Sequence, residues 1–74
     1  MGGQLQRTVG DNLRAYREAR SWSQEALAEV FGWGRTYMGK LERGRCNLTL
    51  QSLEYIASQL EVEPIILLSR GTEL

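Results

Sequence analysis

Residues 23–44 read SQEALAEVFGWGRTYMGKLERG, two short apolar patterns of helical period separated by a glycine-rich turn. Ser23 is a favourable N-cap for the first helix, and Gly32 suits the left-handed conformation that commonly ends a helix. A second helix is expected to begin after Gly34 and to run to about Arg43, where another glycine follows. The stretch therefore predicts two short helices joined by a tight turn.

Three further helices are expected around this pair. From Val9 to Ala19 the apolar positions recur at spacings of four and three, with Thr8 as the expected N-cap. Thr49 is the expected N-cap of the next helix, and Pro64 is expected to open a short last helix through Leu68. The strongest periodic signal lies in the helix after Thr49, on Leu50, Leu53, Ile56, Ala57 and Leu60.

The predicted fold is all-α, with five helices in one compact domain. A chain of 74 residues, 42% of them hydrophobic, supplies one modest core and no second one. The domain is expected to span residues 1–74, with its core at about residues 8–68 and flexible termini.

The composition excludes several classes of function. The chain has no histidine and one cysteine, which rules out imidazole metal sites, histidine-dependent catalysis and an internal disulfide. No pair of nucleophile and base emerges from the other residues, so no enzymatic activity, metal, cofactor or small-molecule ligand is expected. The longest apolar run, residues 65–68, is too short to cross a bilayer, and the unpaired Cys46 indicates a reducing cytoplasm.

The second helix of the pair has an outward face suited to DNA. Helix-turn-helix units present such a helix to the major groove, where arginine and lysine donate to guanine and threonine can bond a base edge. The alternative is that the cations form only a solvated surface. With Met38 and Leu41 turned inward, the outward positions are Arg35, Thr36, Gly39, Lys40 and Arg43.

The charge distribution favours the DNA interpretation. The net charge is zero, from nine basic and nine acidic residues. Residues 1–53 hold eight bases and five acids, net +3, whereas residues 54–74 hold one base and four acids, net −3. Within residues 35–45 there are four bases and one acid, so the basic density peaks on the helix that would enter DNA.

Motifs spread over residues 8–68 resemble a known family. They are Gln24-Glu25-Ala26-Leu27-Ala28, Gly32, Arg35-Thr36-Tyr37-Met38, Leu41-Glu42-Arg43-Gly44, Leu53 through Ala57, and Leu60. Together they look like the lambda-repressor-like helix-turn-helix of phage repressors, Cro proteins and related bacterial regulators. The Arg35-Thr36-Tyr37 start, the Asn47-Leu48-Thr49-Leu50 segment and the short length look most like the controller proteins of restriction-modification systems.

The resemblance implies a role for each matching position. One set of residues would contact base edges. A second set would contact the DNA backbone, and these backbone contacts would fix the register of the protein on the duplex. Arg17 and Glu42 match an ion pair that ties the first helix to the third. The implied base-reading residues are Arg35, Thr36, Gly39 and Lys40, and the implied backbone contacts are Gln24, Tyr37, Arg43, Arg45 and Asn47.

The run Ile65, Ile66, Leu67 and Leu68 is expected to form a homodimer interface. Four consecutive helical residues point around the whole circumference, so one small core cannot cover all of them. Either the last helix covers the core with two and leaves the others exposed, or the run closes a two-fold dimer, which the resemblance also implies. The dimer is favoured because a chain of 74 residues without disulfides or metal sites gains stability from it.

The sequence thus predicts a sequence-specific, double-stranded DNA-binding transcription regulator in the cytoplasm of a bacterium or phage-infected cell. It would act as a homodimer on a pseudo-palindromic operator, by recruiting or blocking RNA polymerase. The alternative is an antitoxin or adaptor, a protein-interaction module whose acidic C-terminal half binds a partner.

Overall fold

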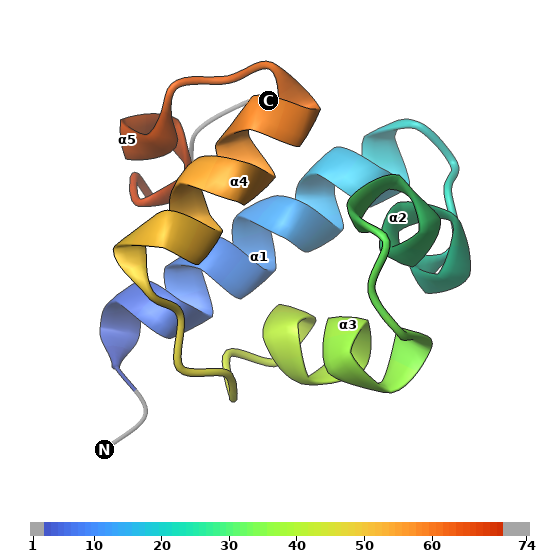
Figure 1. Ribbon diagram of the computed structural model, residues 1–74, viewed down its shortest axis with the longest axis horizontal. Helices are drawn as coiled ribbons and strands as arrows, with labels where there is room; N and C mark the ends of the chain where they lie inside the picture. The colour runs from blue at the N-terminus through green and yellow to red at the C-terminus, as the bar shows by residue number, and fades with distance from the viewer. Residues whose placement is uncertain (1–2, 71–74) are drawn as a thin grey trace.

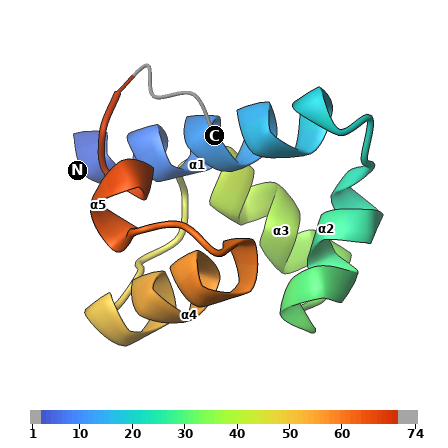
Figure 2. The same ribbon diagram turned by 90° about the horizontal axis from the view of Figure 1, so that it is seen from above.

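The computed structural model describes residues 3–70 and folds them into five helices. The helices are α1 (Gln4–Ala19), α2 (Gln24–Phe31), α3 (Arg35–Glu42), α4 (Leu50–Leu60) and α5 (Pro64–Leu67). The long α1 contacts both α3 and α5, while α2 packs on α3 and α4 (Figure 1). Figure 2 shows α5 between the N-terminal half of α1 and α4, with α2 near the other end of α1. The predicted all-helical fold is confirmed.

One core lies between the helices, and all five contribute to it. Phe31 of α2 and Met38 of α3 are almost fully buried, as are Leu13 of α1, Ile56 of α4 and Leu67 of α5. Because apolar burial is the main stabilising term in a chain of this size, α2 and α3 are held by the same core as the other helices.

Three helix ends lie where their cap residues predicted them: the start and the end of α2 and the start of α4. The Ser23 hydroxyl accepts a hydrogen bond from the Ala26 amide at 3.0 Å, and the Thr49 hydroxyl accepts one from the Ser52 amide at the same distance. Gly32 ends α2 in the left-handed conformation, with φ of 72°. These caps satisfy amide and carbonyl groups that have no partner within the helix itself.

The predicted start of α1 is wrong. The helix begins at Gln4 instead of Val9, more than one turn earlier, and Gly3 is its N-cap. Thr8 lies inside the helix, where its hydroxyl donates to the Gln4 carbonyl at 3.0 Å. Threonine often satisfies its hydroxyl in this way, so it fits a helix interior as well as a cap.

The orientation of α5 is fixed by Asn12, a buried side chain of α1. Its amide nitrogen lies 2.9 Å from the carbonyl oxygens of Leu67 and Ser69, and 3.4 Å from that of Ile66. The last carbonyls of a four-residue helix lack intrahelical partners, so these bonds stabilise the end of α5 against α1. They also determine which side of α5 faces the core.

Two expectations about apolar positions are corrected. Leu67 is fully buried in the core of its own chain, so it is not available for the homodimer interface predicted for it. Leu50, expected to be buried, is 80% exposed because the first turn of α4 projects beyond the core. Leu53, one turn later, is the first buried residue of α4.

Candidate nucleic-acid interface

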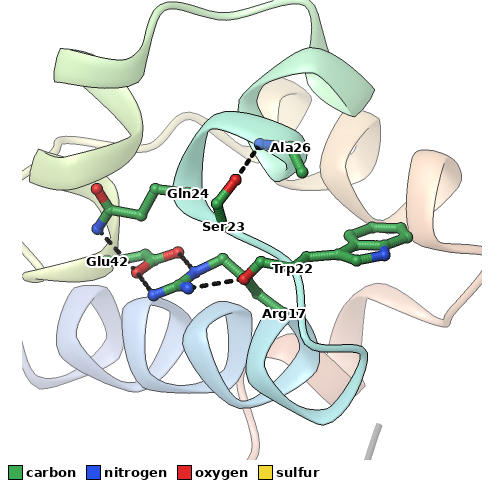
Figure 3. A network of polar contacts seen from close by, with 6 residues as sticks. All are labelled: Arg17, Trp22, Ser23, Gln24, Ala26 and Glu42. Atoms are coloured by element: carbon green, nitrogen blue, oxygen red, sulfur yellow. Dashed lines mark hydrogen bonds and ion pairs between the residues drawn. The ribbon is translucent and has the colours of Figure 1, made fainter.

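Three helices meet at the carboxylate of Glu42, the last residue of α3. Its two oxygens accept from Nε and Nη2 of Arg17 at 2.7 and 3.0 Å, and Oε1 also accepts from Nε2 of Gln24 at 3.0 Å. Arg17 Nη1 donates in addition to the Trp22 carbonyl at 2.9 Å (Figure 3). This network links α1, the start of α2 and the end of α3, so it sets the orientation of α3.

The electrostatics of the network favour the charged state of both partners. Burial alone would raise the pKa of Glu42, but hydrogen bonds from Arg17 and Gln24 lower that pKa below its ordinary value of 4.5. The hydrogen bond to Glu42 raises the pKa of Arg17. The Glu42 side chain is only 1% exposed, and ionised partners make its hydrogen bonds strong.

The end of α3 lies directly against the backbone of α1 at Gly10. A Cβ atom on Gly10 would fall 2.6 Å from the carbonyl oxygens of both Leu41 and Glu42. Real Cβ atoms do not approach oxygens so closely, so this packing requires glycine at position 10. The close approach brings Glu42 within reach of Arg17.

Most of the expected outward face of α3 is exposed. Arg35, Thr36, Lys40 and Arg43 are all exposed, and the helix carries no acidic residue in its first turn. Gly39 is a correction, because it is buried where it was expected to face base edges. A Cβ at this position would lie 3.5 Å from the Arg43 guanidinium and 3.8 Å from Gln24 Oε1, so these side chains cover Gly39.

The expected backbone contacts flank this face on both sides. Gln24 is half-buried and engaged with Glu42, while Arg45 and Asn47 are exposed in the connection after α3. Asn47 Oδ1 accepts from Nε2 of Gln6 at 2.9 Å, which joins this connection to α1. Tyr37 is half-buried, and its burial raises the pKa of its hydroxyl.

Aromatic side chains support the start of α3. Trp33 packs with its ring centroid 5.1 Å from Phe31, 5.0 Å from Tyr37 and 5.6 Å from Tyr55. The Tyr55 hydroxyl donates to the Phe31 carbonyl at 2.8 Å, which holds α4 to the end of α2. The turn between α2 and α3 is therefore a packed element.

Comparison with known proteins assigns the family. The family described as "Helix-turn-helix domain" matches residues 8–65. This chain belongs to that helix-turn-helix family. Control protein C.SmaI of Serratia marcescens is 39% identical over 66 residues, which cover 89% of this chain and 79% of that protein.

Solved structures place this helix-turn-helix protein among transcription regulators. The hypothetical transcription factor NHTF from Neisseria has a TM-score of 0.81 and 35% identity, covering 96% of this chain and 82% of that one. The restriction-modification controller protein C.AhdI from Aeromonas hydrophila has a TM-score of 0.71 and 39% identity, covering 84% and 94%. Two further curated relatives are longer, and the chain spans 55% and 39% of their lengths. The predicted resemblance to repressors and controller proteins is confirmed.

Two arginines of this helix-turn-helix protein that the sequence did not predict as site residues lie next to the candidate interface. Arg7 and Arg14 of α1 are exposed, and they line a groove together with the connection that follows α3. Their spacing of seven residues, two helical turns, was the available signal. This spacing alone does not indicate a site, because it does not show that this face of α1 lies next to the end of α3.

Two kinds of feature are absent from residues 3–70. These residues contain no group of three or more acidic or cysteine side chains able to hold a metal ion. None of the five helices is both long and apolar enough to span a membrane.

Proposed function

We propose that this helix-turn-helix transcription regulator binds double-stranded DNA sequence-specifically, as a homodimer on a pseudo-palindromic operator in the bacterial cytoplasm. We further propose that it is a controller of a restriction-modification system, because C.AhdI is a restriction-modification controller protein and C.SmaI is named a control protein. The observation that carries the proposal is the exposed cationic face of α3, whose orientation is fixed by Arg17, Gln24 and Glu42.

The side chains divide into two groups by position. We assign base reading to Arg35 and Thr36 in the first turn of α3 and to Lys40 one turn later, because all three are exposed on the helix that enters the major groove. Gly39 is left out, since it is buried. We assign backbone contact to Gln24, Tyr37, Arg43, Arg45 and Asn47.

Selection of sites from random duplex DNA tests the base-reading assignment. The selected site should be a pseudo-palindrome whose half-sites lie about 34 Å apart, or a multiple of that distance. Arg35→Ala should cost about 1–3 kcal/mol on that site and relax the preference at one base pair of each half-site. Arg20→Ala, which removes an exposed arginine at the far end of α1, is the control. If Arg35→Ala and Thr36→Ala both select the wild-type site, the assignment is wrong.

A salt series separates a regulator from an adaptor. Specific binding should persist at physiological salt and show a steep negative slope of log K against log salt concentration. An adaptor whose helix-turn-helix is secondary would bind duplex DNA weakly and without regard to sequence.

The homodimer is proposed to form through the exposed side of α5. Ile65 is 65% exposed, and Ile66 and Leu68 are half-buried, so three of the four predicted interface residues remain available. Leu68 also lines a small apolar groove next to Leu5 and Leu50, which are 59% and 80% exposed. A second copy would cover this apolar surface, and the two-fold symmetry would present two α3 helices to one operator.

Sedimentation tests the interface. Ile65→Asp places a charge on the proposed surface without touching the core, so it should yield monomers that keep the wild-type circular dichroism spectrum. Val30→Asp is the matched control, because Val30 is an exposed apolar residue on α2, away from α5 (Figure 1). If Ile65→Asp and Leu68→Asp both sediment as dimers, this surface is not the interface.

Regulation through RNA polymerase is part of the proposal. A promoter that overlaps the selected site should change its transcript yield when the protein is added to purified polymerase. Arg35→Ala should abolish the change at the same protein concentration. An unchanged yield with the wild-type protein would contradict this part.

A further inference from the structure

A groove of about 750 Å³ lies between α1 and the connection from α3 to α4. Arg7 and Arg14 line it from α1, and Arg43 and Arg45 line it from the end of α3 and the connection. Asn47, bonded to Gln6, lies at the same groove. Four arginines from two separate segments of the chain therefore line one open space.

The packing of the backbone brings these two segments together. Gly44 adopts φ of 72°, and a Cβ atom there would lie 2.8 Å from Cα of Arg7. The chain after α3 therefore passes directly against the first turns of α1 (Figure 1). Arg7, Asp11 and Arg14 are spaced by four and three residues, so they share the face of α1 that turns toward this connection.

The groove has an excess of positive charge. Its two carboxylates are Asp11 and Glu42, against four arginines. Glu42 is already paired with Arg17, which does not line the groove. Within residues 3–70 none of the four groove arginines forms an ion pair with a carboxylate. The charge of Arg14 helps to lower the pKa of Glu42, but four arginines against two carboxylates still leave a net positive charge that is suited to bind an anion.

We propose that this groove binds a phosphate of the DNA backbone, with Arg7 and Arg14 as its contacts from α1. The inference rests on the proposed function, because the groove is continuous with Arg43, Arg45 and Asn47, which are assigned to the same backbone. Planar guanidinium groups match the oxygens of a phosphodiester and can bond two of them at once. The DNA-contacting surface therefore extends beyond the helix-turn-helix onto α1.

A phosphate contact has a signature that differs from base reading. It carries no sequence information, so its loss weakens selected and random duplexes by the same factor. Each lost contact also lowers the slope of log K against log salt by about 0.9, because one fewer counterion is released. Between 50 and 200 mM salt the loss of affinity should then be about 3.5-fold smaller for each contact removed.

The experiment compares Arg7→Gln, Arg14→Gln and the double variant with Arg20→Gln. The control makes the same charge change at the C-cap of α1, outside the groove. Arg14→Lys, which retains the charge, should keep the wild-type salt slope. We expect all three groove variants, but not the Arg20→Gln control, to lose affinity by the same factor on selected and random duplexes and to show the smaller slope. Variants that match the control in affinity and slope overturn the proposal, as does a loss confined to the selected duplex.

Duplexes with single neutral methylphosphonate linkages identify the phosphate. Neutralising that linkage should weaken the wild-type protein and leave the double variant unaffected, because its contact is already gone. If every linkage weakens both proteins by equal factors, no backbone phosphate lies in the groove.

Inorganic phosphate distinguishes a free anion from the DNA backbone. Phosphate binding to the wild-type protein can be measured by calorimetry. If phosphate binds and the groove variants do not change DNA affinity, the groove is a site for a free anion and the proposal is overturned.

Failure of the proposed function can be distinguished from failure of the groove. A wild-type protein that binds no duplex overturns both, whereas normal Arg35-dependent site preference with unaffected glutamine variants overturns only the groove.

Discussion

Replacing Glu42 with glutamine removes the carboxylate on which α1, α2 and α3 converge. The change keeps the size of the side chain but deletes an ion pair, and its amide group directs a donor toward the donors of Arg17. Breaking a buried pair by removing one partner costs about 3–5 kcal/mol. Arg17 keeps 15% of its side chain exposed and still donates to the Trp22 carbonyl. The expected loss in free energy of unfolding is therefore about 3 kcal/mol, at the lower end of that range.

Chemical denaturation at pH 7, followed by circular dichroism, measures this loss in free energy of unfolding. Thermal unfolding is a second measurement: a change of 1 kcal/mol shifts the melting temperature of a small domain by about 4–8 °C, so the variant should melt about 12–24 °C lower. Glu54→Gln is the control, because Glu54 is exposed on α4 and its loss should cost less than about 0.5 kcal/mol. All proteins must be compared at one concentration, since self-association shifts apparent stability. A loss below about 1 kcal/mol for Glu42→Gln would refute the idea that this network holds the three helices together.

Three further predictions follow from other features of the structure. Because hydrogen bonds from Arg17 and Gln24 outweigh burial and hold the pKa of Glu42 below 4.5, its contribution is present at neutral pH and is lost as the pH falls through the lowered pKa. The difference in melting temperature between wild type and Glu42→Gln should thus shrink from pH 7 to pH 3, and a constant difference would contradict this. Gly10→Ala should cost about 1–3 kcal/mol in urea denaturation, because its Cβ would meet backbone oxygens of α3; an unchanged midpoint would show that α3 can move away. Thr49→Ala should cost about 1 kcal/mol by the same assay, through loss of the cap of α4, and Thr49→Ser should restore it.

Helix ends in the middle of the chain were predictable because their residues act locally. Ser23 and Thr49 bond amides three residues later, and Gly32 adopts a backbone conformation that other residues disfavour. The start of α1 was not predictable in the same way. Leu5 lies four residues before Val9 and continues the apolar period, but Thr8 has two ways to satisfy its hydroxyl, as a cap or as a donor within the helix, and the cap was the wrong choice.

Side-chain exposure depends on packing between helices, and the exposure predicted from the helical period is wrong at three positions. Gly39 lies on the outward side of α3 by period alone, but Gln24 and Arg43 fold over it. Leu67 lies in an unbroken apolar run, so its inward position depends on the packing of α5 on α1 and α4 and on the bonds from Asn12. Leu50 has the right spacing for burial, but it precedes the point at which α4 reaches the core. A one-dimensional period gives the angle of a residue around its helix, not what lies opposite it.

The two sides of α3 differ in how they are tied to the rest of the molecule. Met38, Leu41 and Glu42 are buried against other helices, whereas Arg35 and Thr36 make no side-chain hydrogen bond or ion pair within residues 3–70. Substitutions on the outward side should therefore be nearly free of folding cost, while those on the inward side are constrained by the whole core. Under the proposed function, substitutions of Arg35 and Thr36 would therefore change the operator preference without compensating changes elsewhere in the protein.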